Sequence, residues 1–134
     1  MPIDGLNHFN LRVHRSELEA VKDFYVDVLG LVIGDRPPFD SSGYWLYADN
    51  APIVHLVEAN PDESLAVTGP NVIDHLAFQC TDLEEATVRL QSAGIEFEAR
   101  QVPGTTQHQL FMSDPVGVGV ELIFEDLSAA AKRA

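Results

Sequence analysis

Two stretches of this sequence carry apolar residues at helical spacing, and segments of alternating apolar and polar residues flank both stretches. Within residues 16–31 and again within 81–95, apolar side chains recur every three or four positions, which predicts an amphipathic helix with one buried face. Ser16 and Thr81 each stand three residues before a glutamate, the spacing of a helix capping box. We therefore expect two helices that begin at these residues.

Each predicted helix ends at a glycine, Gly30 in the first stretch and Gly94 in the second, as expected of a residue that follows the last helical turn. Extended segments rich in β-branched and aromatic residues lie on both sides of the helices, at residues 7–13, 44–57, 74–80 and 109–124. The order of a strand, a helix and about three strands thus occurs twice. This order predicts an α+β fold built from two βαββ repeats.

The two halves also align residue by residue, and the alignment brings metal-ligand residue types to matching positions. His8 aligns with His75 at an offset of 67 residues, and His55 aligns with Glu121 at an offset of 66. Alternation along the strands places all four side chains away from the helix-packed core. Imidazole nitrogens together with a carboxylate suit a divalent ion such as Zn, Ni, Fe or Mn. The sequence therefore predicts a curved mixed sheet around a cleft that holds one metal ion.

Composition limits the size and the partners of the protein. A chain of 134 residues with 46% apolar content fits one domain, 1–134, with modules at about 4–65 and 71–126. A net charge of −13 with eight Lys and Arg residues argues against nucleic acid and anionic membranes. The single cysteine, Cys80, and the lack of a signal or long apolar segment indicate a cytoplasmic protein. Apolar strand positions that an isolated open sheet would expose favour a homodimer.

In its candidate ligands and its repeats, the sequence resembles the vicinal-oxygen-chelate superfamily. This superfamily includes glyoxalase I, methylmalonyl-CoA epimerase, fosfomycin-resistance thiol transferases, extradiol dioxygenases and bleomycin-resistance proteins. The resemblance covers nearly the whole chain and runs through NHFNLRV (7–13), DFYVDVLGL (23–31) and DPVGVGVEL (114–122). It implies a glyoxalase-like fold of paired modules and a dimer. It also implies that one metal ion binds the family's ligand positions, which correspond here to His8, His55, His75 and Glu121.

Several reactions occur in this superfamily, and the residues favour one of them. The four ligands and Arg12, which in the family contacts the glutathione carboxylate, resemble a glyoxalase-I-like lyase or isomerase with Glu121 as ligand and base. An extradiol-type dioxygenase is the alternative, although Phe111 stands where its catalytic tyrosine is expected. A metal-free ligand-binding or resistance protein is the third possibility. Retention of all four ligands favours metal-assisted proton transfer on a small oxygen-rich carbonyl substrate.

Further residues are candidates for contact with the substrate. The polar ones are Asn10, Arg12, Gln79 and His108. Phe111 is a further candidate. The aromatic side chains of Tyr44, Trp45 and Tyr47 are candidates for the pocket wall, and we expect the loop 36–45 to cover the pocket.

Overall fold

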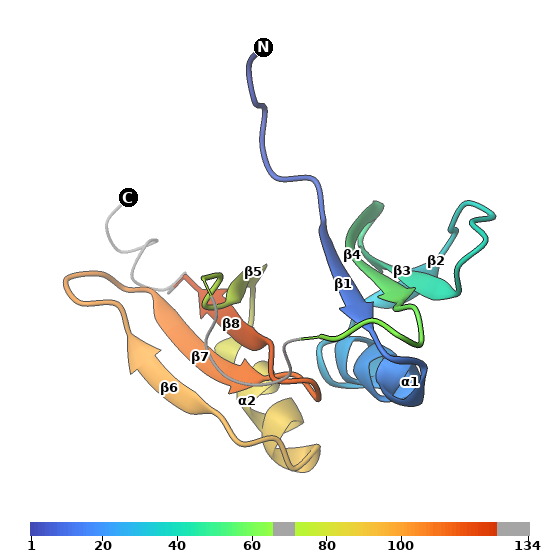
Figure 1. Ribbon diagram of the computed structural model, residues 1–134. Helices are drawn as coiled ribbons and strands as arrows, with labels where there is room; N and C mark the ends of the chain where they lie inside the picture. Colours follow the sequence, from blue (N-terminus) through green and yellow to red (C-terminus); the bar gives the residue numbers. More distant parts are fainter. Residues whose placement is uncertain (66–71, 126–134) are drawn as a thin grey trace. The chain divides into compact units, whose positions relative to one another are not determined.

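A strand, a helix and three further strands follow one another twice along the chain (Figure 1). The computed structural model describes residues 1–65 and 72–125, and it divides into two compact units, Met1–Ala66 and Val67–Ala134. We call these units module 1 and module 2. The α+β class and the two βαββ-like repeats are confirmed. The bounds predicted for module 2, 71 and 126, lie just outside the described residues.

Module 1 contains β1 (Phe9–Val13), α1 (Arg15–Asp23), a π-helical segment η1 (Phe24–Val28), β2 (Val32–Gly34), β3 (Gly43–Ala48) and β4 (Ala51–Glu58). Module 2 contains β5 (Leu76–Cys80), α2 (Leu83–Ser92), β6 (Glu98–Gln101), β7 (His108–Ser113) and β8 (Gly119–Phe124).

Each module forms its own four-stranded mixed sheet, and the two sheets have the same topology. The strand order is β1-β4-β3-β2 in module 1 and β5-β8-β7-β6 in module 2. In both sheets the first and last strands pair in parallel, whereas the other neighbours are antiparallel. The parallel pair requires a crossover, and the helix of each module lies in that crossover. That both sheets curve around one metal cleft stays a prediction.

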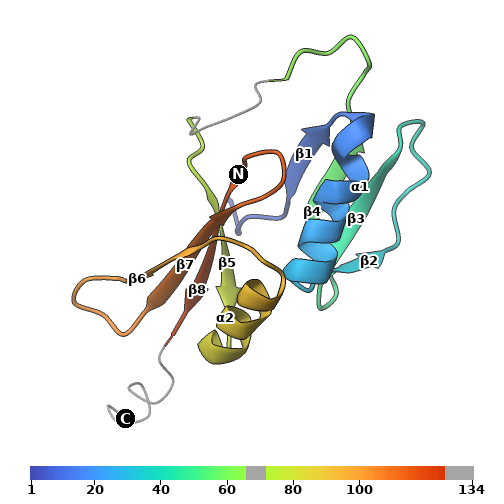
Figure 2. The ribbon, with the colours of Figure 1, turned by 90° about the horizontal axis from the view of Figure 1, so that it is seen from below.

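The helix of each module packs on one face of its own sheet and buries the apolar side of the strands (Figure 2). Side chains at most 7% exposed form the two cores: Val13, Leu18, Val21, Tyr25, Leu46, Val54 and Leu56 in module 1, and Leu76, Leu90, Leu110, Met112, Val120, Leu122 and Phe124 in module 2. Burial of each such side chain contributes about 1.5–3 kcal/mol relative to exposure. The opposite sheet face is therefore the one that remains available for polar chemistry.

The first helix differs from the prediction in its start and in its second half. It begins at Arg15 after His14, whose side chain makes no capping hydrogen bond, so the predicted cap at Ser16 is wrong. Beyond Asp23 the chain continues as η1, where Leu29 N donates to Phe24 O over 3.1 Å. The wider turn of a π-helix lets two consecutive aromatic residues, Phe24 and Tyr25, face the core.

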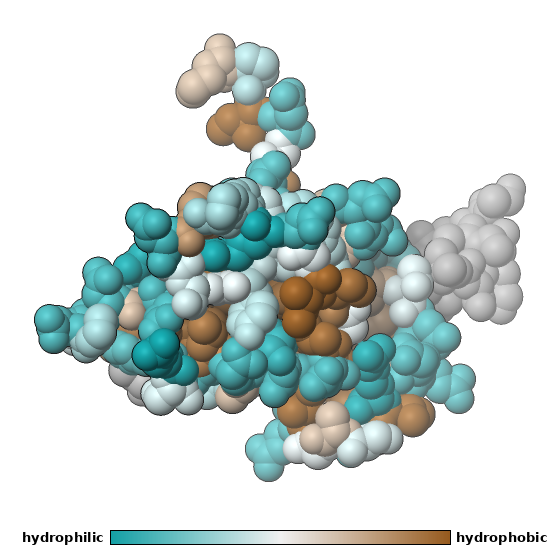
Figure 3. Space-filling view, turned by 90° about the vertical axis from the view of Figure 1, so that its right-hand side faces the viewer, coloured by the Kyte–Doolittle hydropathy of each residue, from teal (hydrophilic) through white to brown (hydrophobic). Residues whose placement is uncertain are grey.

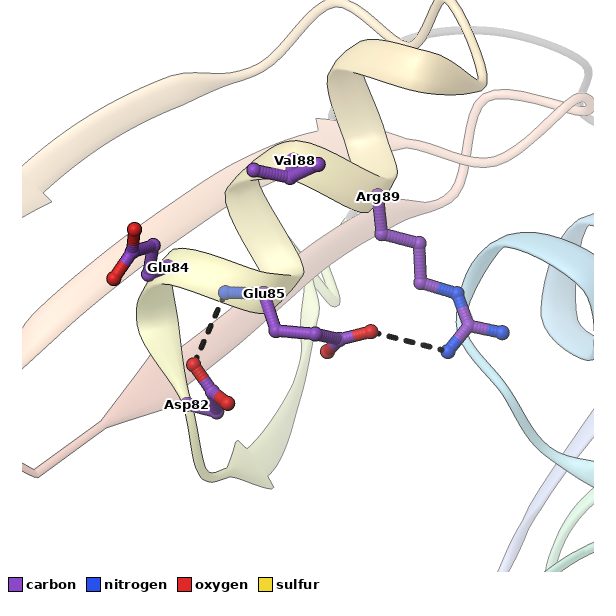
Figure 4. A pocket seen from close by; sticks show the side chains of 5 residues that line it. All are labelled: Asp82, Glu84, Glu85, Val88 and Arg89. Carbon is purple, nitrogen blue, oxygen red and sulfur yellow. Dashed lines mark hydrogen bonds and ion pairs between the residues drawn. The ribbon is translucent and has the colours of Figure 1, made fainter.

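The second helix begins one residue later than predicted. Asp82, not Thr81, is its N-cap, and the Asp82 carboxylate accepts a hydrogen bond of 3.0 Å from the backbone N–H of Glu85 (Figure 4). Asp82 has a φ of 64°, a left-handed conformation that a short polar side chain tolerates better than a β-branched one. At the other end, Gly94 has a φ of 70° and closes the helix, as predicted.

The surface view in Figure 3 is dominated by hydrophilic side chains, with hydrophobic ones gathered in smaller patches. A shallow pocket of about 410 Å³ beside the start of α2 is lined by Asp82, Glu84, Glu85, Val88 and Arg89 (Figure 4). The same picture shows the Glu85–Arg89 ion pair along the helix. Among the described residues, no helix has the length and apolar character needed to cross a membrane.

The N-cap of α2 gives a direct test of this fold. We expect Asp82→Ala to lower the free energy of unfolding by about 1 kcal/mol, because it removes the capping acceptor. Thr81→Ala is the matched control and should change it by less than about 0.5 kcal/mol. Urea denaturation followed by circular dichroism measures both. An equal loss in the two variants would contradict the assignment of the cap.

Candidate metal centre

The predicted ligands of module 2 lie in direct contact. Glu121 stands on β8 opposite Ala77 of β5, and it is only 5% exposed. His75 immediately precedes β5, and its Nε2 lies 3.0 Å from Oε1 of Glu121. Two ligand-type atoms therefore converge on one point, on the sheet face opposite the buried Val120 and Leu122.

The residue before each predicted histidine ligand orients its ring. Nδ1 of His75 donates to the Asp74 carboxylate over 2.8 Å, and Nδ1 of His8 donates to the Asn7 side-chain carbonyl over 2.7 Å. In both histidines Nε2 is then the nitrogen that remains to bind a metal ion. Such outer contacts of metal-binding histidines fix the ring and raise its basicity. Sequence reasoning missed Asn7 and Asp74, although both occupy the same repeat position.

Gly119 allows the close approach of His75 to β8. A Cβ atom at this position would lie 2.5 Å from the backbone oxygen of Asp74 and 3.0 Å from Cβ of His75. Any side chain there would push the start of β5 away from β8. The glycine therefore holds His75 within reach of Glu121.

The predicted ligands of module 1 contact each other in a different way. The ring of His55 stacks on that of His8 with centroids 3.8 Å apart and an interplanar angle of 12°. The opposite face of His55 stacks on Trp45 at 4.1 Å, also at 12°. Nε2 of His55 donates to the backbone oxygen of Pro52 over 3.0 Å. Burial, followed by the charge of His8, lowers the pKa of His55 below its ordinary value.

Each module thus brings two of the four predicted ligands together. The structure pairs His8 with His55 and His75 with Glu121. Among the described residues, no group of three or more His, Cys, Asp and Glu side chains that could hold a metal ion is present. Neither pair alone supplies three ligand-type side chains, so the four-residue metal site stays a prediction.

A pocket of about 470 Å³ opens beside the histidine pair of module 1. Its lining includes His8, Asn10, Trp45 and His55, together with Arg36, Phe39 and Ser41 from the loop that we expected to cover it. Arg36 donates to the backbone oxygen of Ser41 over 2.9 Å and lies over the Phe39 ring. None of the described lining residues is Asp or Glu, although the chain has 21 of them. The pocket therefore favours an anionic or electron-rich ligand.

Arg12, a predicted substrate contact, forms an ion pair with Glu63. Its Nε and Nη2 donate to the two carboxylate oxygens of Glu63 over 2.7 and 2.6 Å. The hydrogen bonds from Arg12 lower the pKa of Glu63, and those same bonds raise the pKa of Arg12. Both groups face solvent, so the pair contributes little to stability. In this structure the two carboxylate oxygens of Glu63 occupy the Arg12 guanidinium, and the contact of Arg12 with a substrate stays a prediction.

Two of the three predicted aromatic wall residues also lie elsewhere. The Tyr44 hydroxyl donates to Glu19 of α1, and the hydrogen bond to Glu19 raises the pKa of Tyr44. Alternation explains this position, because Trp45 faces the pocket and its neighbour must face the helix. The Tyr47 hydroxyl donates to the backbone oxygen of Asp35 over 2.6 Å and its ring covers Gly34. Trp45 alone of the three lines the module 1 pocket.

The remaining candidates lie on the strands of module 2. Phe111 pairs with Glu121 across β7 and β8, and its ring meets His75 edge-on at 5.6 Å. His108 shares its strand side with the buried Leu110, and its contact with a substrate stays a prediction. Gln79 is exposed and donates to the backbone oxygen of a residue on β8 over 3.2 Å.

Comparison with known proteins places the chain in a family. Residues 5–122 match the model of the Glyoxalase/Bleomycin resistance protein/Dioxygenase superfamily, and the chain belongs to this superfamily. It is 27% identical to a lactoylglutathione lyase from Pseudomonas putida over 87% of this chain and 83% of that protein. It is 28% identical to a lactoylglutathione lyase from Schizosaccharomyces pombe, of which it spans only 46%, while the match covers 88% of this chain.

Solved structures show the same fold. The fosfomycin resistance protein FosX from Listeria monocytogenes, complexed with Mn(II) and 1S,2S-dihydroxypropylphosphonic acid, superposes with a TM-score of 0.70 at 19% identity. The match covers 98% of this chain and all of that one. The predicted family resemblance and glyoxalase-like fold are therefore confirmed.

Proposed function

We propose that the chain is a metal-dependent lyase or isomerase of the glyoxalase-I type, which moves a proton on a small oxygen-rich carbonyl substrate. One observation carries the proposal. Glu121 is a buried carboxylate whose Oε1 lies 3.0 Å from Nε2 of His75, and Asp74 holds the other nitrogen of that ring. A carboxylate and an imidazole that converge in this way form part of a site for a divalent ion.

The residues fit a metal ion, with His8, His75 and Glu121 as the ligands that we propose. Nε2 of both histidines is available, because Nδ1 donates to a neighbouring oxygen in each case. The Mn(II) bound in FosX supports a metal ion at this site. The similarity to two lactoylglutathione lyases supports the glyoxalase-I type of reaction. Zn, Ni, Fe and Mn all suit this donor set. When bound, the ion would polarise a substrate carbonyl and acidify the adjacent C–H group.

The protein residues supply the positioning and the proton transfer. Glu121 accepts the proton from the carbon next to the carbonyl and returns it to the product. His75 lies next to this carboxylate, with its Nε2 3.0 Å from Oε1 of Glu121. Asn10 and Arg36 border the module 1 pocket and orient the oxygen-rich part of the substrate. Trp45 and Phe39 line the same pocket and provide an apolar wall that limits water.

The ligand affinities test the metal site. We expect His8→Ala and His75→Ala each to weaken Mn²⁺ or Zn²⁺ binding by at least about 10- to 100-fold. Loss of a residue that only contacts a metal ligand typically costs that much affinity, and loss of the ligand itself should cost no less. His108→Ala is the matched control, since this histidine faces the core side of β7, and it should bind like the wild type. Isothermal titration calorimetry on chelator-treated protein measures the affinities. Full metal occupancy in the His8→Ala variant would refute the site.

The role of Glu121 is tested by Glu121→Gln. Glutamine still offers an oxygen ligand but cannot accept a proton near neutral pH. We expect this variant to keep metal and to lose the rate of the proton-transfer step by about 10²–10⁴-fold, the usual contribution of a general base. The assay follows a hemithioacetal substrate and deuterium uptake from solvent. Oxygen consumption with a catechol by the wild type, without deuterium uptake, would instead establish the dioxygenase alternative.

We also propose that the protein is a homodimer. The edge strand β2 exposes Val32 and Ile33 by 63% and 46%. Exposed apolar edge strands favour association. Sedimentation velocity at micromolar concentration should give twice the 14.7 kDa mass of the chain. A stable monomer under these conditions would contradict the proposal.

A further inference from the structure

His55 occupies the repeat position of Glu121, but its surroundings differ from those of a ligand. His8 covers one face of its ring at 3.8 Å and Trp45 covers the other at 4.1 Å. Both neighbouring rings are inclined to His55 by only 12°. His55 is therefore the middle ring of a three-ring stack, and only 9% of its surface is exposed.

One ring nitrogen of His55 is already bound. Nε2 lies 3.0 Å from the backbone oxygen of Pro52, and a carbonyl oxygen can only accept, so this nitrogen carries the hydrogen. His8 and His75 show the opposite arrangement, because in both of them Nδ1 donates and Nε2 is available. In His55 the nitrogen that keeps its lone pair is therefore Nδ1, whereas in the other two histidines it is Nε2.

The stack also prevents His8 and His55 from sharing one ion. An imidazole binds a metal through a lone pair that lies in the plane of its ring. The planes of His8 and His55 are nearly parallel and separated by a stacking contact, so they do not meet within bonding distance of either ring. An ion bound in the plane of the His8 ring would therefore lie outside the plane of the His55 ring. In module 2 the contact is of the other kind, since the Glu121 oxygen meets a ring nitrogen of His75.

We propose that His55 is a positioning residue that holds His8 and is not a fourth metal ligand, so that the protein ligands are His8, His75 and Glu121. This inference rests on the proposed metal site. His8 is exposed and immediately precedes β1, so its ring needs support from its surroundings. Asn7 fixes the edge of the ring and His55 fixes its face. The stack in turn rests on Trp45 of β3, which pairs directly with His55.

Two substitutions of His55 separate the two roles. His55→Phe keeps a flat ring and removes the nitrogens, whereas His55→Gln keeps donor atoms and removes the ring. If His55 positions His8, His55→Phe binds Mn²⁺ nearly as tightly as the wild type, and His55→Gln binds about 10-fold or more weakly. If His55 were a fourth ligand, His55→Gln would bind Mn²⁺ more tightly than His55→Phe. Titration calorimetry with Mn²⁺ on the chelator-treated full chain measures all three affinities, and circular dichroism confirms that each variant is folded.

A measurement on the wild type needs no substitution. The chain loaded with one equivalent of Cu²⁺ should show nitrogen hyperfine couplings from two imidazoles by electron paramagnetic resonance, and the same couplings should persist in His55→Phe. Couplings from three imidazoles in the wild type would overturn the inference. Binding of Mn²⁺ by the wild type that is lost in His55→Phe would overturn it as well, while leaving the proposed function in place. Failure of the wild type to bind Mn²⁺ would overturn both.

Discussion

The parallel pairing of the first and last strands in each module is the constraint on which the candidate site depends. It sets Asn10 opposite His55 in module 1 and Ala77 opposite Glu121 in module 2. A histidine two positions before Asn10 or Ala77 lies on the same face of its strand, next to the residue on the last strand. A register shift of one residue would turn His55 or Glu121 toward the helix. The helix-packed core excludes that shift, because it would expose the apolar side of the strand.

The two modules share one backbone topology, but the side chains at matching positions make different contacts. At the matching position on the last strand, Glu121 offers an oxygen to a nitrogen of His75, whereas His55 offers the face of a ring to His8. The neighbouring aromatic rings also differ between the modules, since Phe111 contacts His75 edge-on and Trp45 stacks on the face of His55. In the proposed function, module 2 contributes the acid–base group. Module 1 contributes a fixed imidazole and a pocket that holds no acidic side chain among its described lining.

The repeats and the strand faces could be predicted because they follow from local periodicity. Alternation alone separates His8 and Asn10 from the buried Val13, and two related halves predict two related sheets. The choice of helix cap was harder, because Asp82 and Thr81 are both good capping residues and the left-handed backbone at Asp82 decides between them.

Contacts between residues far apart in the sequence could not be predicted from the sequence pattern. Glu63 engages Arg12 across 51 residues, and no periodicity indicates this pair. The stacking of His55 likewise depends on a ring from a third strand, Trp45. Residue type and repeat position made His55 a ligand candidate, but only the mutual orientation of the rings distinguishes a ligand from a support. The alignment of Asn7 with Asp74, in contrast, was a usable signal, since both place an oxygen acceptor before a candidate histidine.

The central proposal is that His8, His75 and Glu121 bind a single metal ion. A crystal structure of the wild-type protein with one equivalent of Zn²⁺, with anomalous data at the zinc edge, tests it directly. The account predicts one peak at about 2.0–2.2 Å from Nε2 of His8, Nε2 of His75 and an oxygen of Glu121. It also predicts that His55 remains stacked on His8. A peak bonded to His55, or one that lacks either His8 or Glu121, would contradict it.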